Sequence, residues 1–379
     1  MFNPIRSKYF RLLAIPACIA ATQSHAEQPT HSMPQASAIA YPTADSGLGE
    51  KLYPDESIYA GKIAAVIEQS IRKQYTAGNA KRDAHPKAHG CVKAEFHVLA
   101  NVPSQWAQGM FIPDKTYPAW IRFSNGSGDA TKADIRGDAR GMAIKILDVA
   151  GTKLLEDENQ ASTQDFIMIN HPVFFANEPK SYLQLITDIN GNLFQKALIP
   201  FALGFKGTKI ALQTASSKIP NPMQTRYFSM VPYQLGTGTN RLAVKYSARS
   251  CSNATDPIPS HPEHNYLRSA LKNALQKDDA CMEFLVQPRT SKAMSVEDSM
   301  TEWDESQAPF YKVATIRIPK QEFDTPEQNL FCENLSFSPW HTLAEHKPLG
   351  ATNRMRKVIY NHISRLRHEM NSAPRQEPK

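Results

Sequence analysis

The segment "VKAEFHVLA", residues 92–100, decides the fold class, because it has the pattern of a strand with one buried face. Apolar residues occupy every second position, and polar or charged residues lie between them. The apolar residues are Val92, Ala94, Phe96 and Val98. A period of two is typical of a strand with one face on a core and the other in water. The segment therefore predicts a half-buried β-strand.

Other short apolar segments occur along the chain, and the first three are bounded by Gly, Pro or Asp. They are residues 118–124, 141–149, 165–175, 241–248, 282–288 and 311–319. Consecutive strands with short polar connections favour an antiparallel sheet, and six to eight of them fit a closed or nearly closed barrel. Helical periodicity covers residues 60–75, 178–218, 265–277 and 353–370. We expect an α+β fold, an antiparallel β-barrel with flanking helices.

The N-terminus has the pattern of a secretory signal peptide. Residues 1–11 carry three basic residues and no acid, ten apolar residues follow, and Ser24 and Ala26 have the small side chains of a cleavage site. We expect cleavage after Ala26 and an exported protein, periplasmic or secreted. Residues 27–57 are polar and Pro-rich and predict an extended arm, residues 58–370 the folded domain, and residues 371–379 a polar tail.

The composition excludes some functions. Removal of residues 1–26 would lower the net charge from +7 to +4, and the basic residues are scattered among acids, so we expect no nucleic-acid partner. No later segment has the length and apolarity of a membrane span. The position of Cys251 after one strand and of Cys281 before another suits a disulfide in an exported protein. Cys91 and Cys332 lie in apolar segments, where we expect buried thiols.

The helical segment "RMRKVIYNHISRLR", residues 354–367, places cations around one phenol. Arg356 precedes Tyr360 by four residues and Arg367 follows it by seven, so all three can share one helix face. A guanidinium one turn away favours the phenolate form of tyrosine. The same spacing also suits a solvated basic helix with a tyrosine at its edge.

Five segments in a fixed order resemble motifs of the haem catalase family. They are "RDAHPK" (82–87), "RFS" (122–124), "DARGMAIKI" (138–146), "INHPVFF" (169–175) and "RKVIY" (356–360). The segment "ENLSFSPWH" (333–341) resembles a sixth motif of the family. The residues of these motifs are most similar to those of the small catalase-related branch. The resemblance extends over roughly residues 75–370 and implies a catalase-like barrel.

The resemblance implies haem b as cofactor, with Tyr360 as the axial ligand of the iron and Arg356 as its charge partner. It implies that His85 transfers the proton of a bound peroxide and that Ser124 orients it. His89 competes with His85 for this role, but only His85 keeps the spacing from Arg82.

Further positions follow from the same resemblance. Arg82, Arg122 and Arg367 correspond to arginines that bind the haem carboxylates. Tyr182 and Phe175 would lie against the haem, and Phe174 would wall the distal pocket; each of these aromatic residues also suits an ordinary core. Asp138 is either a residue of the access channel or a turn residue.

One departure concerns the distal amide of the family. Ungapped alignment places Ile169 there, with Asn170 one position late, and successive strand residues face opposite sides. We include Asn170, together with His85 and Ser124, among the candidate catalytic residues.

The function implied is reduction of hydrogen peroxide or organic peroxides with an unidentified electron donor, with catalase activity as a second possible reaction. The alternatives are an isomerase or lyase of fatty-acid hydroperoxides and a non-enzymatic haem-binding protein. The oligomeric state stays open, a homo-oligomer included.

Overall fold

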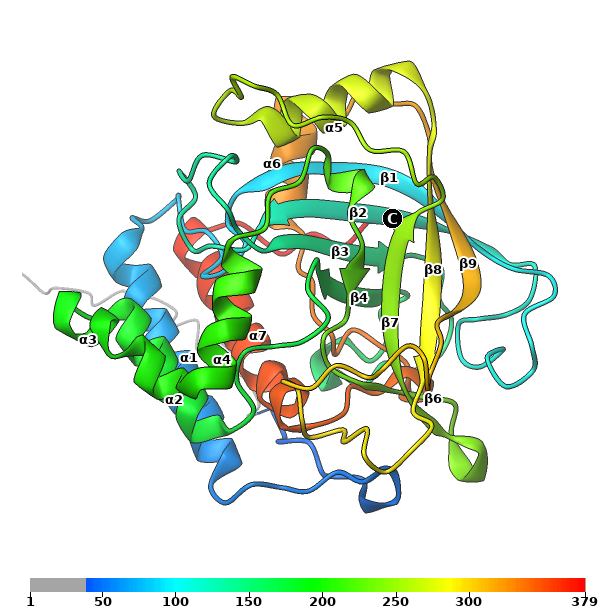
Figure 1. Ribbon diagram of the computed structural model, residues 1–379, viewed down its shortest axis with the longest axis horizontal. Coiled ribbons are helices and arrows are strands. Elements are labelled where there is room, and N and C mark those ends of the chain that lie inside the picture. The colour runs from blue at the N-terminus through cyan, green and yellow to red at the C-terminus, as the bar shows by residue number, and fades with distance from the viewer. Residues whose placement is uncertain (1–38, 379) are drawn as a thin grey trace, which may run out of the picture. The chain divides into compact units, whose positions relative to one another are not determined.

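Antiparallel strands form one sheet that closes into a barrel (Figure 1). The computed structural model describes residues 39–378. The strands are β1 (Ala88–Val98), β2 (Thr116–Asn125), β3 (Arg140–Ile146), β4 (Gln164–Ile169), β5 (Tyr227–Phe228), β6 (Tyr233–Leu235), β7 (Leu242–Ser250), β8 (Ala280–Pro288) and β9 (Tyr311–Ile318). Their order is β5-β4-β3-β2-β1-β9-β8-β7-β6, and pairing of β5 with β7 closes a ring of eight strands. The predicted antiparallel barrel is confirmed.

The barrel interior is filled by apolar and aromatic side chains, as the alternation in β1 predicts. Val92, Ala94, Phe96 and Val98 are buried, whereas Lys93 is exposed. The Phe96 ring centroid lies 5.1 Å from that of Phe284. Edge-to-face contacts of this kind add stability to apolar burial. The interior is therefore a packed core. A functional site would have to be formed by the outside of the barrel and the helices.

Helices cover the outside of the barrel (Figure 1). They are α1 (Glu56–Gln74), α2 (Pro179–Asn190), α3 (Leu193–Ala197), α4 (Ile199–Ala215), α5 (Tyr266–Lys277), α6 (Pro326–Asn334) and α7 (Ala351–Asn371). The predicted helical segments are confirmed, and residues 178–218 form three helices. Ile63 and Ile67 of α1 pack in one cluster with Met355 and Ile359 of α7. Within residues 39–378, no helix combines the length and apolarity needed to cross a bilayer.

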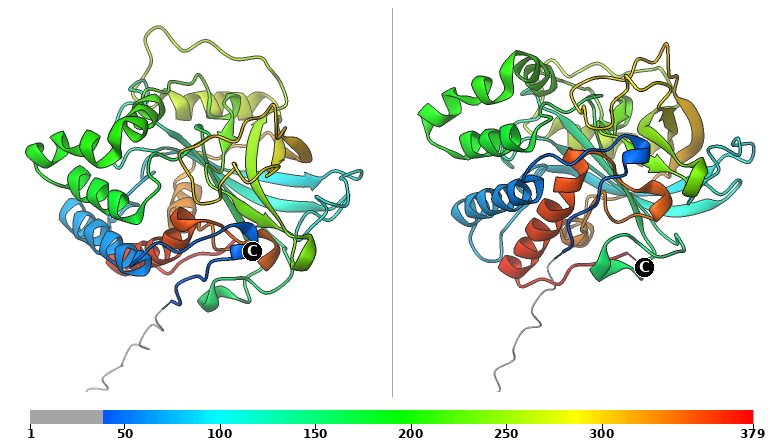
Figure 2. Two further views of the ribbon diagram at one scale, coloured as in Figure 1. Left: turned by 60° about the horizontal axis from the view of Figure 1, so that its bottom comes forward. Right: turned by 90° about the horizontal axis from the view of Figure 1, so that it is seen from below.

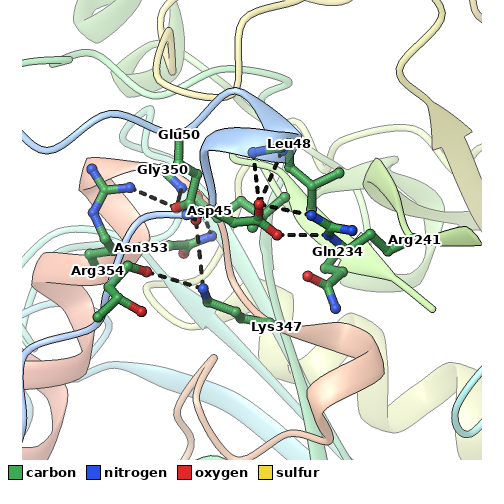
Figure 3. Close-up of polar contacts among 12 residues, drawn as sticks. Asp45, Leu48, Glu50, Gln234, Arg241, Lys347, Gly350, Asn353 and Arg354 are labelled. Carbon is green, nitrogen blue, oxygen red and sulfur yellow. Dashed lines mark hydrogen bonds and ion pairs between the residues drawn. The ribbon is translucent and has the colours of Figure 1, made fainter. Parts of the chain in front are cut away.

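The chain before α1 is anchored to the start of α7. Figure 3 shows Glu50 beside Arg354, whose Nη1 donates a hydrogen bond of 2.6 Å to the Glu50 carboxylate. Arg354 is fully buried and also binds the carboxylates of Glu56 and Glu297. A buried guanidinium needs such partners, because an unpaired buried charge is strongly destabilising. The contacts fix the first turn of α7, two residues before Arg356. The predicted signal peptide, residues 1–26, lies outside the described residues.

Two disulfides join distant segments. Cys251 and Cys281 are bonded, with their Cα atoms 5.4 Å apart, so the predicted pairing is confirmed. Cys91 of β1 is bonded to Cys332 of α6, with Cα atoms 5.9 Å apart. The expectation of free buried thiols at these two positions is therefore wrong. They are 241 residues apart in the chain, and no local pattern reveals that α6 packs on β1.

Candidate active site

Tyr360 and Arg356 form a hydrogen-bonded pair on α7. Arg356 Nη2 donates to the Tyr360 hydroxyl oxygen over 2.9 Å, and its guanidinium carbon lies 4.9 Å from the centre of the phenol ring. The four-residue spacing on a helix produces this contact. Arg356 Nη1 donates to Asn353 Oδ1 over 3.1 Å, which holds the guanidinium in place. The arrangement directs a fixed positive charge at the Tyr360 oxygen.

His85 lies in the turn before β1, in a conformation that the surrounding structure imposes. Its φ angle is +61°, a value that a non-glycine residue adopts at a cost of about 1–3 kcal/mol. Its Nδ1 is 3.0 Å from Ser124 Oγ on β2. The ring packs on Gly141 of β3, where an added Cβ would lie only 2.5 Å from Nδ1. A glycine at position 141 is therefore necessary for the observed position of the imidazole.

His85 is neutral near pH 7. Burial, followed by the positive charges of Arg122 and Arg356, lowers the pKa of its imidazole to about 4. A neutral imidazole can accept a proton and return it.

His89 has a different environment, within the sheet. It is fully buried on β1, and its Nε2 donates to Asn125 Oδ1 over 2.9 Å. Burial lowers its pKa to about 3. Of the two candidate histidines, the structure therefore brings His85, and not His89, to Ser124.

Three arginines from distant segments gather around one carboxylate. Arg82 Nη1 donates to Glu333 Oε1 over 2.9 Å, and Arg367 donates to the main-chain oxygen of Glu333. Burial by itself would raise the pKa of Glu333, but Arg82, Arg122 and Arg367 lower it. The motif containing Glu333 was recognised in the sequence, but its role as partner of this cluster was missed.

The arginine cluster carries more positive than negative charge. Arg122 is buried, and within the described residues its Nε has no hydrogen-bond partner. Burial and the charge of Arg82 lower the pKa of Arg122 to about 9, and the same two causes lower that of Arg367 to about 9. Buried cations in this state are stabilised by an added anion. The cluster of Arg82, Arg122 and Arg367 therefore suits a ligand with carboxylates.

Aromatic side chains lie next to these polar groups. The rings of Phe174 and Phe175 have centroids 4.2 Å apart, and Phe174 meets Tyr182 edge-on at 5.5 Å. Burial raises the pKa of Tyr182. Tyr182 of α2 packs against the cluster that contains Met355 and Ile359 of α7, although the two helices are far apart in sequence.

The register of the sheet places Ile169 on the same face as Ser124. Ser124 pairs with Gly141, and Gly141 pairs with Ile169. Directly opposite residues of antiparallel strands share a face, so Ile169 continues the row on which His85 rests. The side chain of Ile169 is apolar and buried.

Asn170 has its amide engaged by other groups. Its Oδ1 accepts from the main-chain nitrogen of Arg140 over 2.7 Å, and its Nδ2 donates to Ser217 Oγ over 2.7 Å. Asn170 is hydrogen-bonded to neither His85 nor Ser124 among the described residues. Asp138 accepts from the main-chain nitrogen of Ser127 over 3.1 Å, which is the contact of a turn residue.

A cavity of about 210 Å³ adjoins Tyr360. Its lining includes the hydroxyl groups of Ser336 and Ser364 and the imidazole of His341. His341 lies between two carboxylates, 2.8 Å from Asp165 and 2.7 Å from Glu158. Burial alone would lower the pKa of His341, but the two carboxylates raise it. The sequence does not reveal this group, because the three residues come from separate segments.

Comparison with known proteins agrees with the fold. Residues 70–192 match the catalase family model. A fungal catalase is similar with a TM-score of 0.62 and 17% identity, covering 78% of this chain and 60% of its own. Catalase A from Saccharomyces cerevisiae has a TM-score of 0.56 and 18% identity, covering 81% and 66%.

A bacterial catalase is also similar, with a TM-score of 0.56 and 15% identity over 91% of this chain and 67% of its own. Because the matches cover 60% of the fungal protein and 66% of the yeast protein, the chain spans less than two thirds of the length of either. No curated protein sequence matches. Residues 70–192 are thus similar to the catalase family, and the barrel with its flanking helices has the catalase fold.

Proposed function

We propose that the chain is an exported, haem-dependent enzyme that reduces hydrogen peroxide or organic peroxides. One observation carries the proposal: Arg122 of the positively charged arginine cluster donates a hydrogen bond to the main chain of His85, and α7 carries a phenol hydrogen-bonded to Arg356. Each group comes from a different part of the chain. A solvated basic helix would not require this convergence.

The side chains fit a haem. Tyr360 would be the ligand of the ferric iron, with the Arg356 guanidinium hydrogen-bonded to its phenol oxygen. Arg82, Arg122 and Arg367 would bind the haem carboxylates, which would supply the negative charge that the cluster lacks. Tyr182 and Phe175 offer aromatic surface to the ring. When bound, haem supplies the redox-active iron at which the peroxide bond is cleaved.

His85 would handle the proton of the peroxide. With Nδ1 directed to Ser124, Nε2 is the nitrogen available to accept a proton from one peroxide oxygen. The imidazole would then return that proton to the other oxygen as it leaves. Because its pKa is about 4, His85 is ready to act as a base over the neutral pH range.

The wall beside His85 favours reduction by an electron donor over release of oxygen. Oxygen release requires a second peroxide to be held and oxidised. Ile169 offers that molecule no hydrogen bond, and the amide of Asn170 is already bound to Arg140 and Ser217. We therefore infer peroxidase turnover with an external donor as the main reaction at low peroxide concentration.

Export to the periplasm or the medium is part of the proposal. The pattern of residues 1–26 supports it. The two disulfides also support it, since disulfides persist mainly in oxidising compartments.

The test is the visible spectrum of the purified protein before and after addition of hydrogen peroxide, with dissolved oxygen and oxidation of a dye followed in parallel. We expect a haem spectrum that peroxide changes, dye oxidation and little oxygen. A haem spectrum without peroxide turnover would point to a haem carrier. Conversion of a fatty-acid hydroperoxide without a reductant would point to an isomerase or lyase. A protein that cannot take up haem would overturn the proposal.

A further inference from the structure

A second surface of the molecule, formed by residues 189–218, exposes large apolar side chains. This segment, called here the apolar hairpin, contains α3 and α4. Figures 1 and 2 show it in green, and in Figure 1 α3 lies at the outer edge of the helical layer while α4 lies nearer the barrel. The exposed fractions are 85% for Leu193, 73% for Phe194, 83% for Phe201 and 90% for Phe205. Single exposed apolar residues are ordinary, but four in one short segment are typical of an interaction surface.

The apolar hairpin carries only positive charge. It contains four lysines and no Asp, Glu, Arg or His. The lysines are Lys196, Lys206, Lys209 and Lys218, and all four are exposed. Large apolar residues combined with lysine are typical of segments that lie in the interface of a bilayer, where lysine meets the lipid phosphates.

The inner side of the apolar hairpin is held by the protein. Ile210 is buried, and an added Cβ at Gly207 would lie 2.6 Å from the main-chain oxygen of Phe175. The start of α3 is closed by a capping box between Asn192 and Gln195. The exposed phenylalanines therefore project from a folded support and do not belong to a loose loop. Phe175 also connects the support to the aromatic wall of the candidate active site.

Either a second copy of the protein or a lipid surface could cover the apolar hairpin. The positive charge of the hairpin distinguishes between these two partners. In a symmetric dimer formed through the apolar hairpin, the same patch of each copy would face its counterpart. Each set of four lysines would then oppose an identical set, and like charges across an interface are unfavourable. An anionic lipid surface buries the same apolar side chains and offers opposite charge. We propose that the apolar hairpin docks the protein on the surface of bilayers that contain anionic phospholipids.

The test is flotation of the full chain with vesicles of two compositions. One contains phosphatidylcholine and phosphatidylglycerol in equal amounts, and the other contains phosphatidylcholine alone. We expect binding to the anionic vesicles at low salt, weaker binding at high salt, and little binding to the neutral vesicles. The double variant Phe201→Ser/Phe205→Ser should weaken binding by about tenfold or more. Lys196→Gln/Lys209→Gln should weaken it and reduce the effect of salt.

The control variants change exposed apolar residues at other sites. Leu52 is 55% exposed and Leu330 is 64% exposed, so Leu52→Ser and Leu330→Ser should bind vesicles like the unchanged protein. Circular dichroism would verify that every variant is folded. Absence of binding to the anionic vesicles would overturn the proposal, as would equal weakening by the control variants. So would sedimentation data in which Phe201→Ser/Phe205→Ser converts a dimer to a monomer without any effect on vesicle binding.

Discussion

Arg122 Nη2 donates a hydrogen bond of 2.8 Å to the main-chain oxygen of His85. The same arginine belongs to the cluster around Glu333. One side chain of β2 therefore links the proposed carboxylate-binding cluster to the backbone of the proposed base. Since His85 has a positive φ angle, its position depends on such contacts, and cofactor binding and proton transfer should be coupled.

Replacement of Arg122 tests this coupling. Arg122→Leu should weaken haem retention by about tenfold or more, because a charged hydrogen bond of this kind contributes on the order of 1.5–3 kcal/mol. It should also slow peroxide reduction by the haem-loaded fraction, because the His85 carbonyl loses its donor. Haem titration and rates per bound haem measure the two effects. Arg249→Leu, which removes an exposed arginine of β7, should change neither.

The two histidines should differ in their variants. His85→Ala should retain haem and slow peroxide reduction by on the order of 10²-fold or more, as expected for loss of a positioned acid–base group. His89→Ala removes the partner of Asn125 in the sheet and should lower stability while leaving the rate per haem nearly unchanged. Rates normalised to haem content, together with urea denaturation, distinguish them. A rate loss confined to His89→Ala would assign the base to His89.

Ile169 and Asn170 decide how much oxygen is released. Ile169→Asn should raise oxygen release relative to dye oxidation, provided that its hydrogen bonds are satisfied. Asn170→Ala should leave this ratio unchanged, because its amide binds Arg140 and Ser217. An oxygen electrode and a dye assay on the same samples give the ratio. Strong oxygen release by the unchanged protein that collapses in Asn170→Ala would instead make Asn170 the distal amide.

Acid should destabilise the fold through its buried histidines. Burial lowers the pKa of His89 and of His346 to about 3, whereas an unfolded histidine titrates near pH 6.5. Their contribution to stability is present above pH 6.5 and is lost as the pH falls towards 3. Each contributes a slope of about 1.4 kcal/mol per pH unit in that window. Urea denaturation at several pH values measures the slope, which His346→Gln should reduce. An unchanged slope in a folded His346→Gln protein would contradict this assignment.

The barrel could be predicted from sequence because its signals are local. The alternation in β1 fixes which side chains enter the core, and the apolar stripe of α1 fixes the face that packs on α7. Closure by pairing of β5 with β7 is a long-range contact, which short segments do not reveal. The Cys91–Cys332 bond was missed for the same reason.

The candidate site could be predicted only in part. The Arg356–Tyr360 pair follows from helical spacing, and the order of the motifs led to His85 and Ser124. The role of Glu333, the support of His85 by Gly141 and the buried group around His341 depend on side chains that meet in three dimensions. The periodicity of a short segment does not predict such long-range contacts.

The most direct test of the central claim is haem binding by the Tyr360→Phe protein. Both the unchanged protein and the variant would be freed of haem and titrated with haemin, with the visible spectrum followed to saturation. Tyr75→Phe is the control, because it removes the same hydroxyl group from a tyrosine that packs against the cluster formed by α1 and α7. We expect tight, saturable binding by the unchanged protein and by Tyr75→Phe, and loss or a weakening of about tenfold or more for Tyr360→Phe. The same haem content and the same spectrum in Tyr360→Phe would contradict this expectation.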